Sequence, residues 1–360
     1  MKAKRYLLLL CALCLCATVL SGCTQGRANA DVHVFYYTYS DPYISTVRAA
    51  LDKQLSDAGI SYQDHDSNNN QTTQTEQVQT AITKGAKLIV VNIVTTGSDD
   101  AANGIVKLAK DAGIPVIFFN REVSDEVVRS YAKCAFIGTD AAEAGYLQGD
   151  MIGDYLVKNY NKVDLNGDGK ISYVMFMGEK GNNEAIYRTK YSVENANKKL
   201  VAASKPELTF YDKSNTDKYL LDREGKWSAQ AANEYMTTLL ASYNPQNKNM
   251  VELIICNNDG MAEGAISALN AAGYNTGKQD AINVPVFGVD ATSAAVSLIG
   301  SGKMAGTIKQ DADGMAKAIR MCVQNGLGDK GILEGMSGYQ IDKDAAKLRI
   351  SYAIYVGEDK

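Results

Sequence analysis

The segment "AKLIVVNIVTTGSDDAANGIVKLAKDAGIPVIFFN" (residues 86–120) decides the fold class. A short apolar run (86–92) leads into a stretch of helical length, and a second apolar run (114–120) follows. Apolar strands that alternate with helices are typical of βαβ units and a parallel sheet. The chain repeats this pattern from "VELIICNN" (251–258) to "VPVFGVD" (284–290). We therefore expect an α/β protein with two similar, doubly wound lobes.

The sequence on the amino-terminal side of this segment fits the same plan. "VHVFYYTY" (32–39) reads as a first strand, and "STVRAALDKQLSDAG" (45–59) reads as a helix that ends at glycine. The next strand, "ISYQDHD" (60–66), follows at once. In such sheets ligands bind beyond the carboxyl ends of the strands, so two facing lobes would share one cleft.

Polar residues stand where such a cleft is expected. Asn120, Asn258 and Asp290 end three of the apolar runs, and Asp41 follows the first strand. Each has an alternative interpretation, because Asn and Asp also form turns after strands, and Asp41 could cap the next helix. Three strand-end residues in matching places favour a common site.

A sugar is a ligand that uses this mixture of side chains. Its hydroxyls both donate and accept hydrogen bonds, and the C–H face of its ring packs on a flat aromatic surface. Trp227 in "REGKWSAQAA" is one candidate surface, and Arg188 in "NNEAIYRTKY" is a candidate donor. Alternatively, Trp227 is a surface or packing residue and Arg188 is a solvated helix charge.

The first residues predict export. "MKAKRYLLLLCALCLCATVLSGC" combines a basic start, a short apolar core and small residues before Cys23, which together indicate a signal peptide over residues 1–22. "LSGC" (20–23) resembles a bacterial lipobox, and that resemblance implies a lipid on Cys23 and a tethering linker over 23–30. The alternative is an ordinary signal peptide that contains cysteine.

Composition argues against several other classes. A net charge of −4 offers no basic face for nucleic acid. His33 and His65 are the only histidines, and neither a nucleophile elbow, a Walker loop, a CxxC nor an HExxH motif occurs, so an enzyme is not expected. Cys134, Cys256 and Cys322 lie among apolar neighbours and are predicted to be buried free thiols.

The segment "DLNGDGKIS" (164–172) has the first half of an EF-hand calcium loop, with Asp164, Asn166 and Asp168 at alternate positions. The bidentate Glu of an EF-hand is missing, because position twelve is Met175 in a predicted strand. Either the match is accidental, or the carboxylate comes from elsewhere in the chain.

Several long motifs, in order along nearly the whole mature chain, resemble the galactose/glucose-binding proteins of bacterial ABC importers. They are "YSDPYISTVR", "IPVIFFNRE", "FIGTDAAEAGYLQGD", "DLNGDGKI", "VELIICNNDGMAEGA" and "VPVFGVDA". The resemblance implies the type I periplasmic-binding fold, with two lobes and a three-strand hinge that closes over one monosaccharide. The N-terminal lobe would hold 31–139 plus about 312–343, and the C-terminal lobe 140–311 plus about 344–360.

Carried over by motif, the resemblance implies a set of sugar contacts and two aromatic stacking positions. The contacts would be Asp41, Asn120, Arg188, Asn258 and Asp290, with Tyr43 and Trp227 stacking on the sugar. Three positions depart from the family pattern of His, Asp and Asn: here they are Asn182, Glu184 and Gln310. Glu184 and Gln310 are one methylene longer than the family residues, and a methylene changes affinity by roughly 1–3 kcal/mol.

The resemblance also implies a structural calcium ion in the C-terminal lobe. Side chains of Asp164, Asn166 and Asp168 and the carbonyl of Lys170 would bind it, with Glu252 supplying the distant bidentate carboxylate. Ser172 replaces a longer amide.

The implied partners are a monosaccharide, an ABC importer permease and the membrane, which the protein would reach through its lipid anchor. The protein is expected to be monomeric. The alternative is a sugar sensor that presents its closed form to a chemoreceptor or sensor kinase. A LacI-like repressor shares the type I fold but needs an N-terminal helix-turn-helix, whereas the first strand here is expected to follow a lipid anchor and a short linker.

Overall fold

The computed structural model describes residues 30–278, 280–328 and 330–357. Its first sheet has the strand order β12-β13-β5-β4-β3-β1-β2, and all its pairs are parallel except β12 with β13. The strands are β1 (Val32–Tyr36), β2 (Tyr62–Asp66), β3 (Leu88–Val91), β4 (Val116–Phe119), β5 (Cys134–Gly138), β12 (Gln340–Asp342) and β13 (Lys347–Arg349).

Helices cover both faces of this sheet because its central strands are buried on both sides. One core lies under α2 and α11, and a second lies under α3, α4 and α5. The helices are α2 (Pro42–Asp57), α3 (Gln71–Thr83), α4 (Asp100–Ala112), α5 (Asp125–Arg129) and α11 (Ala312–Leu327).

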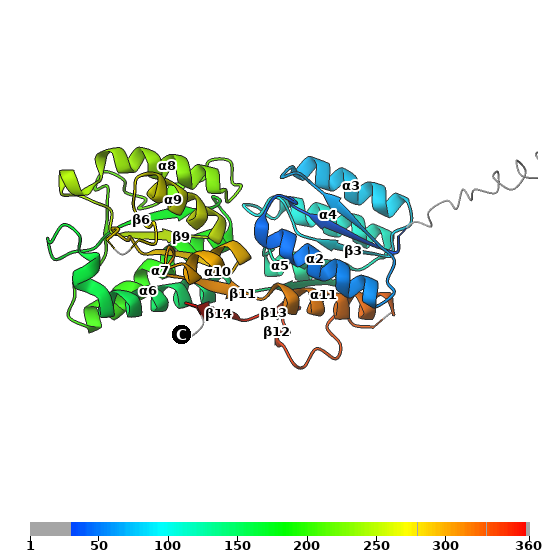
Figure 1. Cartoon of the computed structure of the whole chain (residues 1–360). Helices are drawn as coiled ribbons and strands as arrows, with labels where there is room; N and C mark the ends of the chain where they lie inside the picture. Colours follow the sequence, from blue (N-terminus) through cyan, green and yellow to red (C-terminus); the bar gives the residue numbers. More distant parts are fainter. Residues whose placement is uncertain (1–29, 279, 329, 358–360) are drawn as a thin grey trace, which may run out of the picture. The chain divides into compact units, whose positions relative to one another are not determined.

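The second sheet has the order β14-β11-β10-β9-β6-β7, with β8 also pairing with β6, and only β14 runs antiparallel to its neighbour. In Figure 1, α8 and α9 lie together on one side of this sheet, and α6 and α7 lie on the other. The elements are α6 (Ala141–Val163), β6 (Ser172–Met177), α7 (Asn183–Ala202), β7 (Thr209–Phe210), β8 (Leu220–Leu221), α8 (Ala229–Ser242), the 3₁₀ turn η1 (Pro245–Asn247), β9 (Leu253–Cys256), α9 (Asp259–Ala271), β10 (Val286–Asp290), α10 (Ser293–Gly300), β11 (Gly306–Gln310) and β14 (Tyr352–Tyr355).

The two lobes repeat one topology. Along the first sheet the strands run β2-β1-β3-β4-β5, and along the second β7-β6-β9-β10-β11, so the same doubly wound order recurs. The echoed segments of the sequence become β3 and β4 in one lobe and β9 and β10 in the other. The predicted fold of two doubly wound lobes is confirmed.

The chain passes between the two sheets at three places. It leaves the first sheet after β5, returns after β11, and leaves again between β13 and β14. The predicted end of the N-terminal lobe near residue 343 is too early, because β13 pairs with β5 and the first sheet therefore extends to Arg349. The sequence pattern missed β12 and β13 because each is only three residues long.

A close contact between α6 and α7 holds the helix that carries Arg188. Gly145, Gly149 and Gly153 form one stripe of α6, and a Cβ at Gly149 would lie 2.6 Å from the Cβ of Asn195 and 2.8 Å from the carbonyl oxygen of Ser192. Only glycine allows this approach, so α7 lies directly against α6.

Several predictions concern residues outside this description. The signal peptide (1–22), Cys23 and the linker up to residue 29 lie outside the described residues. Within the described part of the chain, no helix is both long and apolar enough to cross a membrane. Cys134, Cys256 and Cys322 are buried free thiols, as predicted.

Candidate functional site

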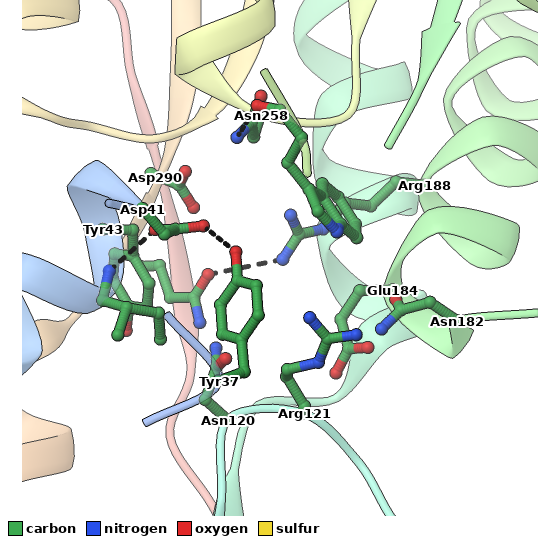
Figure 2. Close-up of a pocket in the computed structure, with 13 residues that line it drawn as sticks. Tyr37, Asp41, Tyr43, Asn120, Arg121, Asn182, Glu184, Arg188, Asn258 and Asp290 are labelled. Carbon is green, nitrogen blue, oxygen red and sulfur yellow. Dashed lines mark hydrogen bonds between the residues drawn. The ribbon is translucent and has the colours of Figure 1, made fainter. Parts of the chain in front are cut away.

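All ten predicted sugar-contacting residues line one cleft, whose space between atoms, open solvent at its mouth included, is about 380 Å³. The described residues from Asp31 onward belong to one compact unit, and residues from both of its lobes line the cleft. Figure 2 shows the side chains of Asp41, Asp290, Arg188 and Glu184 directed into this shared space. The lining residues are Tyr37, Asp41, Tyr43, Ile44, Asn120, Arg121, Asn182, Glu184, Arg188, Trp227, Asn258, Asp290 and Gln310.

Some of these side chains also cap helices. Asp41 accepts a hydrogen bond from Ile44 N (2.8 Å) at the start of α2, and Asn258 accepts one from Met261 N (2.9 Å) at the start of α9. Asn182 caps α7 by accepting from Ala185 N at 3.0 Å. The capping interpretation of Asp41 was therefore right as local structure, but it does not exclude a place in the cleft.

Two strand-end residues adopt a backbone conformation that turns them into the cleft. Asn120 follows β4 with φ of 60°, and Asp290 ends β10 with φ of 130°. Positive φ is uncommon for residues with a Cβ and is found more often at functional sites. Asn92 Nδ2 donates to the Asn120 Oδ1 atom at 3.1 Å and fixes that side chain.

Arg188 is buried, with only 4% of its surface exposed, so it is not a solvated helix charge. Its Nη1 donates to the Asn257 carbonyl (2.9 Å), and its Nη2 donates to Gln310 Oε1 (3.3 Å) and Tyr352 Oη (2.9 Å). The Tyr352 hydroxyl also contacts Thr139 Oγ1 at 2.8 Å. Thr139, Gln310 and Tyr352 each stand at one of the three passages between lobes, so Arg188 is connected to the whole hinge.

Several buried polar atoms in the cleft have no hydrogen-bond partner among the described residues. They are both carboxylate oxygens of Glu184, Arg188 Nε and Gln310 Nε2. Burial raises the pKa of the Glu184 carboxyl, which Arg188 opposes, and burial holds the pKa of Asp290 well above its ordinary value. Since buried polar groups are almost always paired in proteins, these atoms indicate a polar ligand.

Aromatic rings supply the apolar part of the cleft wall. Trp227 is 8% exposed, and its ring lies so close to the backbone of Gly178 that a Cβ there would be 2.2 Å from the indole. Tyr43 is buried, and its hydroxyl lies 3.9 Å from the Met315 sulfur. Trp227 is therefore a packed wall of the cleft and not a surface residue.

The sequence reasoning missed three lining residues, Tyr37, Ile44 and Arg121. Arg121 directly follows Asn120 after β4, and Tyr37 directly follows β1. Their positions just after strand ends could have drawn attention to them. Arg121 would still look like an ordinary surface charge, because its partner, Glu179, is 58 residues away in the other lobe.

The structure brings Glu252 to the predicted calcium loop. Glu252 Oε1 accepts from Leu165 N (2.8 Å) and Asn166 N (3.1 Å), and its Oε2 accepts from Ser172 N (2.8 Å). Asp164 accepts from Gly167 N and Gly169 N at 2.8 and 3.0 Å. The loop is therefore held by the buried carboxylate of Glu252, the residue just before β9.

The other predicted ligands of this loop make local hydrogen bonds or are exposed. Asn166 and Asp168 each accept from a backbone N–H two residues later, at 2.8 and 2.9 Å, and Lys170 is exposed. Ser172 Oγ donates to the Met250 carbonyl at 2.9 Å. Within the described residues, no group of three or more His, Cys, Asp or Glu side chains is arranged to hold a metal ion.

Comparison with known proteins gives a consistent result. The chain is 34% identical over 351 residues, 96% of each chain, to the D-galactose/methyl-galactoside binding periplasmic protein MglB of Haemophilus influenzae. It is 27% identical over 313 residues to the ribose import binding protein RbsB of Escherichia coli, covering 87% of this chain and 89% of that one.

A solved structure shares the fold. The ABC transporter solute binding protein of Clostridium phytofermentans, crystallised with β-D-glucose, has a TM-score of 0.70 and 21% identity, over 90% of this chain and 93% of that one. The family model described as periplasmic binding protein domain matches residues 32–330. With its two doubly wound lobes and the cleft between them, the chain belongs to the periplasmic binding protein family.

Proposed function

We propose that this protein captures a monosaccharide of the glucose or galactose type outside the cytoplasm and delivers it to an ABC importer. The observation that carries the proposal is the cleft itself. There, buried atoms of Glu184, Arg188 and Gln310 that have no hydrogen-bond partner among the described residues stand beside Trp227 and Tyr43. A ring with hydroxyls at its edge and C–H groups on its faces satisfies both kinds of surface. The similarity to a galactose-binding relative supports this ligand class.

Binding by hinge closure follows from where the contacts originate. Asp41 and Asn120 belong to the first lobe, whereas Glu184, Arg188 and Asp290 belong to the second. A sugar held by both sets favours the closed state because only that state offers all contacts at once. The closed form would then present both lobe surfaces to the permease.

We propose that the protein binds its sugar and does not catalyse a reaction of it. His33 and His65 lie on β1 and β2 with ring nitrogens 2.8 Å apart, and neither lines the cleft. Two of the carboxyl groups that line it, those of Glu184 and Asp290, have pKa values raised chiefly by burial, and both can hydrogen-bond to sugar hydroxyls.

The preference among sugars should depend on Glu184 and Gln310, whose side chains are each one methylene longer than the residues of the family pattern. We expect wild-type protein without its tether to bind at least one of glucose, galactose, ribose and arabinose in titration calorimetry. Combining Glu184→Asp with Gln310→Asn should change the ranking of these sugars, because each retracted methylene changes affinity by roughly 1–3 kcal/mol.

The matched control is Glu207→Asp, which shortens an exposed carboxylate of the same lobe and should leave the ranking unchanged. An unchanged ranking in the double variant would show that these positions do not set specificity. Failure of wild-type protein to bind any of the four sugars would contradict the proposed ligand class.

We further propose that the 164–172 loop binds a structural calcium ion. The residue types fit, since Asp164, Asn166, Asp168, the Lys170 carbonyl and Ser172 belong to one loop, Glu252 contacts that loop, and hard oxygen ligands suit calcium. The described carboxylates are not already gathered around a common point, so the loop would rearrange around the ion. Such an ion would neutralise the carboxylates and fasten the loop to the second lobe.

Calcium should raise the melting temperature of the wild type, and a chelator should reverse the effect, because an ion bound only by the folded state stabilises it by mass action. Asp168→Asn keeps the hydrogen bond to Lys170 N but removes one charge, so its calcium response should shrink. Glu252→Gln should melt lower even without calcium, because Glu252 also accepts from three backbone N–H groups. Equal calcium responses in all three proteins would contradict the site.

Anchoring by a lipid on Cys23 is the remaining part of the proposal, and "LSGC" supports it. Cys23→Ser should release the protein from the membrane fraction without changing sugar affinity, which fractionation and calorimetry would measure. Full membrane attachment of this variant would contradict the lipid anchor.

A further inference from the structure

An ion pair joins the two lobes beside the cleft. Arg121, just after β4 in the first lobe, donates through Nη2 to the Glu179 carboxylate, just after β6 in the second lobe. The side chains are only 5% and 16% exposed. A buried pair of this kind interacts strongly because little water screens it.

The same carboxylate has two more donors. Thr96 of the first lobe donates its hydroxyl to Glu179 Oε1 at 3.3 Å, and Trp227 of the second lobe donates Nε1 to Glu179 Oε2 at 3.3 Å. Glu179 therefore contacts the opposite lobe and the aromatic wall of its own lobe at once.

The chain of contacts continues from Arg121 into the first lobe. The Arg121 guanidinium lies over the Tyr37 ring, 4.3 Å from its centroid, and the Tyr37 hydroxyl donates to Asp41 Oδ2 at 2.6 Å. A continuous chain from Asp41 through Tyr37, Arg121 and Glu179 to Trp227 thus crosses the cleft.

We propose that Glu179 is a positioning residue that makes closure of the lobes and orientation of the Trp227 ring a single event. The inference rests on the proposed sugar-binding function and adds a residue that does not itself line the cleft. When the lobes separate, Arg121 and Thr96 leave the carboxylate, and Glu179, the hydrogen-bond partner of the Trp227 N–H, is no longer held in position by the first lobe. The ring then holds a sugar firmly only while the cleft is closed.

Release kinetics give the first test. Glu179→Gln and Arg121→Met should each raise the sugar dissociation rate at least about tenfold with little change in the association rate, as is usual when one partner of a buried charge pair is removed. The double variant should dissociate no faster than the faster single variant, because both remove the same contact. Stopped-flow fluorescence measures these rates, with Trp227 as the only tryptophan.

A second readout needs no sugar. Arg121 is joined to the Trp227 N–H through the Glu179 carboxylate, so Arg121→Met should increase quenching of Trp227 fluorescence by acrylamide in ligand-free protein, as should Glu179→Gln. Glu207→Gln, an exposed carboxylate of the same lobe, is the control and should change neither rates nor quenching. Melting temperatures, measured alongside, separate this effect from general destabilisation.

The two readouts distinguish failure of this inference from failure of the proposed function. Sugar binding with unchanged dissociation rates and unchanged quenching in both variants would overturn the role of Glu179. If no sugar binds the wild type, the proposed function fails, and quenching alone decides: an increase in both variants supports the coupling, and no increase overturns it.

Discussion

Asp290→Ala is expected to abolish measurable binding of every sugar that the wild type binds. Asp290 ends β10 with its side chain in the cleft and only 7% of its surface exposed. Without the carboxylate, sugar hydroxyls in the closed cleft stay unpaired, and each unpaired buried group costs about 1–3 kcal/mol. Removing an aspartate bonded to two ring hydroxyls would therefore lower affinity by about 2–6 kcal/mol, which is roughly thirtyfold to more than ten-thousandfold.

Titration calorimetry measures this loss, and Asp217→Ala serves as the control because Asp217 is an exposed aspartate of the same lobe. The melting temperature of Asp290→Ala, measured alongside, separates loss of a ligand contact from loss of the fold. Wild-type affinity in Asp290→Ala would show that the sugar lies elsewhere.

Arg188→Met should destabilise the protein as well as abolish binding. Arg188 is the cation that faces Glu184 and Asp290, and it also bonds Asn257, Gln310 and Tyr352. Removing one member of a buried charge group costs about 3–5 kcal/mol, because the opposite charge stays buried. Chemical denaturation should show this loss, and Lys198→Met, an exposed cation of the same helix, should not.

The loss should also depend on pH. Burial raises the folded-state pKa of Glu184 and Arg188 opposes that rise, so removing Arg188 raises the pKa further. A carboxyl whose pKa is higher in the folded than in the unfolded protein contributes most to the free energy of unfolding below its unfolded-state pKa, about 4.3. This contribution falls as the pH rises from there through the folded-state pKa. Arg188→Met should therefore be closest to wild type in unfolding free energy near pH 4 and furthest from it near pH 8. An equal loss at both values would contradict this charge balance.

The lobes and their strand-end residues could be predicted from sequence because both depend on local pattern. Buried parallel strands are continuous apolar runs, and their carboxyl ends point to one edge, which located Asn120, Asn258 and Asp290 before any contact was known. Arg188 and Trp227 could be named as candidates from sugar chemistry, but the motif resemblance was needed to favour them and to add Tyr43, because neither spacing nor composition distinguishes these residues from packing or surface residues.

What could not be predicted depends on contacts between distant segments. Arg121 becomes a cleft residue only because Glu179 meets it from the other lobe. The strand β13 was missed because three residues carry too little periodicity, although its pairing with β5 moves the lobe boundary. Ser172 matched a ligand position by sequence, but its hydroxyl donates to the Met250 carbonyl and to Glu252.

The most direct test of the account is a crystal structure of the protein with the sugar that binds most tightly in the calorimetric panel. We predict one sugar ring in the cleft, packed between Trp227 and Tyr43, with its hydroxyls within hydrogen-bond distance of Asp290, Glu184 and Arg188. A sugar bound outside this cleft, or inside it without contact to those three side chains, would contradict the account.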